Sequence, residues 1–427
     1  MLVPALVLGL TGVALAQDGA TTRRLSLSPE GEPANSRGYF CDIARDATAV
    51  AFDSAASNLV EDDTNDKPDA FVWDQSGVVS RVSVASDGRQ SDSYVQLPRI
   101  SGNGRFVVFW SSTPDLGDHG EGRRLNTAFV HDRTTGKTEP VSVRSDGGRA
   151  NDDSGGGSIS NSGRYVSFSS GASNLAAKGD DNGFNDVFVH DRRSGKTTRV
   201  SLTRKLGETN SDSDQAAISG NGRFVAYDSY ASNIVPRDDN GSLDVFVYDR
   251  VERTTELVSL RTDGRRSSQY SSAPSISGSG RYVSFTSYAV LASTDTAVGQ
   301  DVYVHDRRTG VTEQVSLDNE DRPMNQESAS SSISDDGRRV VFATFADNPG
   351  SGDTNEAMDV YMRDLEAGTT TRVSVGSEGQ QSNGGTYPPP AISPDGRWVC
   401  WMSLATNLDD KPHPGDYEDL FLRGPLS

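Results

Sequence analysis

Cysteine, histidine and basic residues are all scarce in this sequence. It has two cysteines and five histidines in 427 residues, too few for a disulfide framework or a zinc site. Asp and Glu (60) outnumber Lys and Arg (41), giving a net charge of −19. This balance argues against nucleic acid and anionic membrane surfaces, which need a basic patch. It favours cations or basic partners, or serves only solubility.

Long apolar runs are absent after the first residues. The opening "MLVPALVLGLTGVALAQDG" ends its apolar stretch in Ala14-Leu15-Ala16, an A-x-A cleavage pattern. The run is short for a transmembrane helix, and no later stretch qualifies as a membrane span. The sequence therefore predicts a signal peptide at 1–16, a mature start near Gln17, and a secreted or periplasmic protein.

A catalytic constellation is missing as well. Three histidines share one repeat position with other residue types, which indicates packing or surface placement; this set is His131, His190 and His305, with Trp73, Tyr248 and Arg363. No serine lies in a G-x-S-x-G elbow, and repetition accounts for the paired carboxylates without glycosidase chemistry. We expect a protein that is not an enzyme.

What the sequence does contain is a repeat of 57–59 residues. It is marked by a small turn followed by arginine, as in "GNGRF" and "GSGRY", at Arg105, Arg164, Arg223, Arg281, Arg338 and Arg397. A degraded copy, "ARDATAVAF", surrounds Thr48. Self-similarity at such a period is the signature of a repeat architecture, here with seven copies.

Each copy is predicted to form four strands and no helix. The first strand is short and rich in Ser, and a G-N-G type turn joins it to a second strand such as "RYVSFTS". An acidic loop leads to the third strand, "DVYVHDR", and a tight hairpin leads to the fourth, "EQVSL". Consecutive apolar residues such as Val245, Phe246 and Val247 indicate sheets covered on both faces. The prediction is an all-β, seven-bladed β-propeller of four-stranded blades. It is a single domain over 21–427, with blades starting near 39, 98, 157, 216, 274, 331 and 390.

The two ends of the chain complete one blade. The last copy stops after "DLFLRG" without a fourth strand, whereas "TTRRLSLSPEGEPANS" (21–36) matches "TTRVSVGSEGQQSN" (370–383). The N-terminal strand should therefore supply the outer strand of the last blade and close the ring. This closure places Cys41 and Cys400 in neighbouring blades; whether they form a disulfide stays open, because disulfide geometry is restrictive.

The motifs "SPDGRWVCW", "SGSGRYVSF" and "DVFVHDRRSGKTTRVSL" resemble the TolB-like propeller repeats of exported bacterial proteins. The resemblance covers essentially the whole mature chain. It implies the propeller fold and export. The α/β domain that precedes the propeller of TolB has no counterpart in these repeats, so a role in an envelope complex is not carried over.

The loop before the third strand carries the spacing D-x-N-x-x-x-D. It occurs as Asp63, Asn65 and Asp69; as Asp180, Asn182 and Asp186; as Asp238, Asn240 and Asp244; and as Asp353, Asn355 and Asp359. Oxygen ligands at this spacing suit Ca²⁺ and resemble part of the calcium loops of integrin-type propellers, except at the first ligand position. The alternative is that these residues only form Asx-turns. Ca²⁺ in at least one loop is thus one expectation, and turn chemistry alone is the other.

We call the four strands of each copy a to d in chain order, from the short Ser-rich strand to the last one. Tyrosines mark one edge of the predicted ring, where the loops between strands b and c, and between strand d and the next strand a, emerge. Tyr94, Tyr270 and Tyr387 occupy similar places in the d–a loops, and Tyr230 and Tyr288 follow the second strand. Such rings could stack on sugars or dock a basic peptide, or merely pack between blades. We expect a monomeric, non-catalytic binding scaffold for a protein or glycan partner. The alternative is a carbohydrate-active enzyme or lectin using the same rim.

Overall fold

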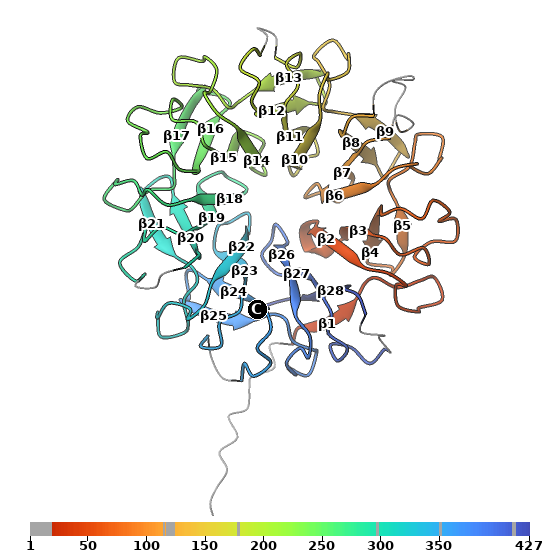
Figure 1. The fold of residues 1–427 in the computed structure, drawn as a ribbon. Coiled ribbons are helices and arrows are strands. Elements are labelled where there is room, and N and C mark those ends of the chain that lie inside the picture. Colours follow the sequence, from red (N-terminus) through yellow and green to blue (C-terminus); the bar gives the residue numbers. More distant parts are fainter. Residues whose placement is uncertain are drawn as a thin grey trace, which may run out of the picture.

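The computed structural model describes residues 19–113, 116, 124–176, 180–295, 299–349, 352–411 and 416–427. The predicted signal peptide lies outside these residues. Seven four-stranded antiparallel sheets stand around a central axis like the blades of a fan (Figure 1). The described residues contain one short 3-10 helix, Arg45–Ala47. The prediction of a seven-bladed β-propeller is confirmed.

In six blades the strands run from the axis outward in chain order, and in the seventh the N-terminal strand lies outermost. The inner strands are β2 (Gly38–Ile43), β6 (Val95–Ile100), β10 (Ser154–Ile159), β14 (Ser213–Ile218), β18 (Ser271–Ile276), β22 (Ser328–Ile333) and β26 (Thr386–Ile392). The second strands are β3 (Ala49–Ser54), β7 (Phe106–Ser111), β11 (Tyr165–Ser170), β15 (Phe224–Ser229), β19 (Tyr282–Ser287), β23 (Arg339–Thr344) and β27 (Val399–Ser403).

The remaining strands form the outer half of each blade. The third strands are β4 (Asp69–Asp74), β8 (Thr127–Asp132), β12 (Asp186–Asp191), β16 (Asp244–Asp249), β20 (Asp301–Asp306), β24 (Asp359–Asp364) and β28 (Asp419–Gly424). The outer strands are β5 (Val79–Arg81), β9 (Lys137–Pro140), β13 (Lys196–Arg199), β17 (Thr254–Leu257), β21 (Val311–Gln314), β25 (Thr369–Arg372) and β1 (Thr21–Arg24). We number the blades 1 to 7 from β2–β5 to β26–β28 with β1.

The apolar runs of the second and third strands form the core between blades. Val187, Phe188 and Val189 of β12 are at most 1% exposed, so both faces of this strand are covered by neighbouring blades. Inside each blade an aromatic ring of the second strand stacks on one of the third, as Phe168 does on Phe188 at 5.7 Å between centroids. The consecutive apolar residues therefore reflect burial on two sides.

Each inner strand contains a register shift close to its start. The bulge residue has a positive φ in five blades: Leu97 (55°), Gly156 (25°), Gln215 (50°), Ala273 (53°) and Ser330 (57°). The strands begin a few residues before the predicted blade starts, because the alternating pattern is legible only after the bulge.

Two buried carboxylates bind the bulges of the next blade. Asp53 accepts a hydrogen bond from the Leu97 backbone N–H at 3.3 Å, and Asp228 accepts one from Ala273 at 3.2 Å. Burial raises the pKa of each carboxyl to about 7. These inter-blade contacts therefore titrate near neutral pH.

The ring closes where the two chain ends meet. β1 pairs antiparallel with β28, from Thr21 opposite Gly424 to Arg24 opposite Phe421 (Figure 1). This confirms the predicted closure by the N-terminal strand. A disulfide joins Cys41 of β2 to Cys400 of β27 with 6.4 Å between Cα atoms, so blades 1 and 7 are also linked covalently.

The repeated "GR-aromatic" motif fastens blades 2 to 6 to one another. Gly163 has φ +73°, and a side chain there would collide with the Phe106 ring of the preceding blade. The same ring lies between the guanidinium groups of Arg105, at 4.8 Å, and Arg192 of the next blade, at 4.2 Å. Arg105 in turn forms a bidentate ion pair with Asp132 at 2.7 Å. The motif is thus explained by packing.

Candidate binding rim and acidic loops

The b–c and d–a loops share one edge of the disc, which we call the rim; the a–b and c–d turns form the opposite edge, the turn face. The five predicted tyrosines lie on the rim. They are Tyr94, Tyr230, Tyr270, Tyr288 and Tyr387, between 45% and 62% exposed. Tyr230 contacts Tyr270 edge-on at 6.3 Å, and the two rings stay accessible.

Two more aromatic side chains belong to this rim and escaped the sequence analysis. Tyr39 is 44% exposed and Phe345 is 46% exposed. Tyr39 is the second residue of β2, as Tyr387 is of β26. Phe345 follows β23 as Tyr288 follows β19. Alignment of the repeats position by position would have found both.

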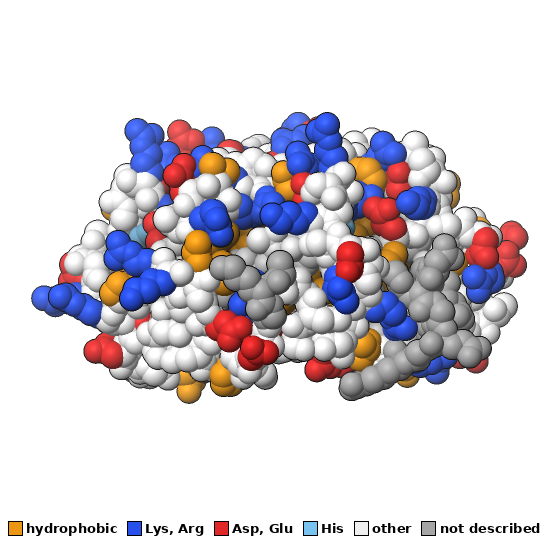
Figure 2. Space-filling model, turned by 90° about the horizontal axis from the view of Figure 1, so that it is seen from above, with side chains coloured by type: hydrophobic (Ala, Val, Ile, Leu, Met, Phe, Trp, Pro, Cys, Tyr) orange, Lys and Arg blue, Asp and Glu red, His pale blue; other side chains and the backbone are white. Residues whose placement is uncertain are grey.

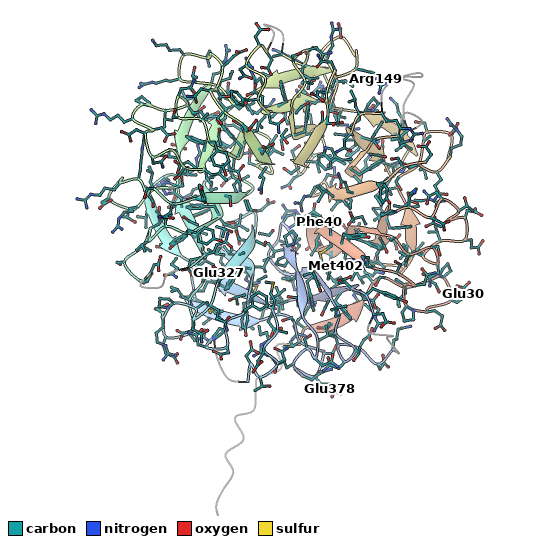
Figure 3. All side chains as sticks on the ribbon, in the orientation of Figure 1. Glu30, Phe40, Arg149, Glu327, Glu378 and Met402 are labelled. Atoms are coloured by element: carbon teal, nitrogen blue, oxygen red, sulfur yellow. A yellow bond between two sulfur atoms is a disulfide. The ribbon has the colours of Figure 1, made fainter. Side chains whose placement is uncertain are left out.

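The inner strands surround a channel of about 510 Å³ along the axis. Phe40 lies at the inner end of blade 1 beside the opening (Figure 3), and the guanidinium of Arg99 stacks on its ring at 3.9 Å. Asp42 accepts a hydrogen bond from the Ile100 N–H at 2.8 Å. Burial raises the pKa of Asp42 and lowers that of Arg99. The channel lining therefore carries two acidic groups, Asp42 and Asp335, and one basic group, Arg99.

A polar network crosses the axis at the turn end of this channel. Asp335 of blade 6 accepts hydrogen bonds from Asn161 of blade 3 at 2.7 Å and from Arg45 of blade 1 at 2.6 Å. The Asn161 side chain fills the space left by Gly102 and Gly220. Three blades thus meet through side chains, and two more contribute the glycines Gly102 and Gly220.

The second aspartate of the acidic pattern has a structural role. Asp186 is buried and accepts a hydrogen bond from Ser201 Oγ at 2.5 Å, while Arg199 donates to it at 2.8 Å. The same serine contact recurs in five other blades, at Asp69, Asp244, Asp301, Asp359 and Asp419. This contact ties the outer strand to the third strand.

The asparagine of the pattern joins two loops. In all four copies its Oδ1 accepts a hydrogen bond from the backbone N–H two residues later, as from Phe184 to Asn182 at 2.9 Å. Its Nδ2 donates to a carbonyl of the following d–a loop, such as that of Thr209 at 3.0 Å. This geometry is an Asx-turn.

The first aspartate of each copy lies beside an arginine. The nearest oxygen-to-nitrogen distances are 3.4 Å for Asp180 and Arg199, 3.6 Å for Asp63 and Arg81, and 3.9 Å both for Asp238 and Arg266 and for Asp353 and Arg372. Burial, with the neighbouring carboxylate, raises the pKa of Asp180 and of Asp238 to about 6. Each pair of carboxylates therefore already has a nearby cation.

Among the described residues no group of three or more His, Cys, Asp or Glu side chains is close enough to hold a metal ion. Asp180 nevertheless keeps two buried carboxylate oxygens without a hydrogen-bond partner. Two carboxylates, backbone carbonyls and water are the ligands that a Ca²⁺ ion could use here. Calcium binding stays a prediction.

The seventh blade shows the same arrangement although its sequence has lost the spacing. Arg24 of β1 lies 2.8 Å from Asp409 and 3.3 Å from Asp419. The cation and the carboxylates come from opposite ends of the chain, so no local pattern could reveal them.

The recurrent histidine is buried and structural. His190 Nδ1 lies 2.9 Å from Thr197 Oγ1, and the equivalent pairs are His131 with Thr138 and His305 with Thr312. Burial lowers the pKa of all three histidines. They link the third strand to the outer strand rather than facing solvent.

Comparison with known proteins identifies the fold. No family model matches the chain, and no curated protein does. Oligogalacturonate lyase from Vibrio parahaemolyticus is 10% identical, with 95% of this chain and 97% of that chain covered and a TM-score of 0.55. The propeller domain of the Trilobed protease from Pyrococcus furiosus, described as having an open velcro topology, is 10% identical over 92% of this chain and 96% of that one, with a TM-score of 0.55.

TolB from Acinetobacter baumannii is also among the similar structures, at 15% identity over 80% of this chain and 65% of that chain, with a TM-score of 0.43. That score is too low to carry an argument. At such identities the likeness establishes the propeller fold alone. No helix in the described residues is both long and apolar enough to cross a membrane.

Proposed function

We propose that this chain is an exported, non-catalytic binding propeller that recognises a protein or glycan partner through its rim. One observation carries the proposal: the rim presents seven half-exposed aromatic rings. Large aromatic surface that a fold leaves exposed is typical of recognition sites, because folding alone would bury it. The loops' acidic groups beside these rings favour basic or hydroxyl-rich ligands.

The polar residues of the repeat support a non-catalytic role. The recurrent histidine, arginine and aspartate side chains are each engaged in holding strands or blades together, as described for His190, Arg105 and Asp186. A catalytic group needs access to substrate and a free proton-transfer partner. His190 and Asp186 are buried, and the exposed Arg105 is held by its ion pair with Asp132.

The second candidate is a carbohydrate-active enzyme or lectin that uses the same rim. The fold similarity to an oligogalacturonate lyase favours testing it. Aromatic rings beside carboxylates would also suit sugar stacking. Turnover of acidic oligosaccharides would replace the scaffold proposal with this one.

The test is a binding screen of glycans and extracellular proteins with the wild-type chain and two variants. The rim variant carries Tyr230→Ala, Tyr270→Ala and Tyr288→Ala. The control carries Val78→Ala and Val251→Ala, which remove exposed apolar side chains (56% and 65%) at the turn face. We expect the rim variant to lose at least about 2 kcal/mol of binding free energy and the control to bind normally. Equal binding by both variants would refute the rim as the site.

A further inference from the structure

The turn face carries a concentration of positive charge over blades 2 to 5. Part of this charge is neutralised, because the motif arginines form ion pairs of 2.6–2.8 Å with the aspartates that end the third strands. These pairs join Arg105 to Asp132, Arg164 to Asp191, Arg223 to Asp249 and Arg281 to Asp306.

A second set of cations on the same face has no such neutralisation. Arg193, Lys196, Arg253 and Arg308 stand exposed on the c–d turns of blades 3 to 5. Within the described residues, no carboxylate forms an ion pair with any of these four side chains, which we call the basic arc. The one exposed carboxylate in these turns is Glu252, 3.6 Å from Arg223.

A deeper layer adds to the positive charge of the basic arc. Arg133 and Arg250 donate to the carbonyls of Gly104 and Gly222, which satisfies their hydrogen bonds without cancelling charge. The disc seen edge-on shows Lys and Arg side chains gathered along its upper edge (Figure 2).

The rim carries the opposite charge. Exposed carboxylates of the b–c and d–a loops include Asp62, Asp181, Asp239, Asp321, Glu327 and Glu356. The whole-chain charge of −19 therefore hides a disc with one acidic edge and a basic arc on the other. Near an anionic surface the net negative charge is repelled, whereas the separation of charge turns the basic arc toward the surface and the acidic rim away from it.

The chemistry of the turn face distinguishes between anionic partners. Single-stranded nucleic acids and sugars are bound by stacking on exposed aromatic rings. On this face the rings of Phe106, Tyr165 and Phe224 are covered by arginines, and the exposed aromatic rings lie on the rim. Cations spread over three neighbouring blades, with no aromatic platform, suit a flat anionic surface.

We propose that the basic arc docks this protein on an anionic lipid surface, with the rim directed away from the lipid. Each Lys or Arg near such a surface contributes binding that salt screens within a Debye length. The partner surface is a bilayer whose headgroups carry a net negative charge. The proposal is independent of which ligand the rim binds.

The test is co-sedimentation with phosphatidylcholine vesicles, with and without phosphatidylglycerol, at low and high salt. The arc variant carries Arg193→Gln, Lys196→Gln, Arg253→Gln and Arg308→Gln. The matched control makes the same change of charge on the rim, with Arg204→Gln, Lys205→Gln, Arg237→Gln and Arg265→Gln, all exposed. Thermal melting checks that both variants fold.

We expect the wild type and the control to bind anionic vesicles at low salt and to leave neutral ones in solution. The arc variant should lose binding by at least about tenfold. Equal losses in the two variants, or no preference of the wild type for anionic vesicles, would overturn the proposal. Tight binding of heparin or single-stranded DNA without vesicle binding would also overturn it, in favour of a polymer partner.

Discussion

Removal of residues 21–28 should destabilise the entire ring, because these residues supply the outer strand of blade 7. Their loss leaves the buried carboxylate of Asp419 without Ser26, at 2.6 Å, and without Arg24, at 3.3 Å. Breaking a buried ion pair from one side costs about 3–5 kcal/mol. Leu25, which is 1% exposed, adds about 2 kcal/mol of apolar burial.

The deletion should therefore lower the free energy of unfolding by about 5–7 kcal/mol, a large part of the roughly 5–15 kcal/mol typical of a folded protein. The assay is urea unfolding followed by fluorescence, with the Cys41–Cys400 disulfide intact and reduced. The loss should be larger after reduction, because the disulfide then no longer holds blades 1 and 7 together.

Thr21→Ala is the matched control, since Thr21 is exposed and its hydroxyl makes only a 3.5 Å contact with the Gly424 carbonyl. This variant should unfold like the wild type. An unchanged unfolding midpoint for the deletion would refute closure by β1. It would show that β28 is stable as a free edge.

Three further predictions concern the joints and the acidic loops. In urea unfolding, Gly163→Ala should lower the free energy of unfolding more than Gly136→Ala. Both glycines have a positive φ, but only Gly163 faces an aromatic ring, that of Phe106 in the preceding blade. Equal losses of stability would contradict the packing of the motif between blades. Asp53→Asn should raise stability more at pH 8 than at pH 5, because a carboxyl whose pKa is raised to about 7 stabilises the fold below its unfolded pKa and loses this stabilisation as pH rises toward 7; a pH profile parallel to that of the wild type would contradict this. Millimolar CaCl₂, unlike MgCl₂, should raise the melting temperature; Ca²⁺ at 100 times its Kd would add about 2.7 kcal/mol to the free energy of unfolding. Asp180→Ala should reduce this rise. If calcium has no effect on melting, the loops form Asx-turns alone.

The fold could be predicted from the sequence because each blade is built from the same short motifs. The turn before Arg105, the apolar run of the third strand and the missing last strand each depend on a short segment. A period of 57–59 residues then fixes the number of blades. Closure was predictable for the same reason, since residues 21–36 still match the outer strand of blade 6.

The site was less predictable, because its contacts join segments that are distant in the chain. Arg24 and Asp409 are 385 residues apart, so the ion pair of blade 7 has no local signature. The asparagine of the acidic pattern was open to two interpretations; the structure shows the turn in its Oδ1 contact with the backbone N–H two residues later, and adds a contact of its Nδ2 with the distant d–a loop. The basic arc is invisible in a net charge of −19, because composition averages over opposite edges.

The network of Arg45, Asp335 and Asn161 spans the axis at the turn face, so the two ends of the axial channel differ in chemistry. One end is bounded by charged and amide side chains that already bind one another, and the other lies toward the aromatic rim. A ligand group that reaches into the channel past Phe40 would therefore meet hydrogen-bonding side chains at the far end.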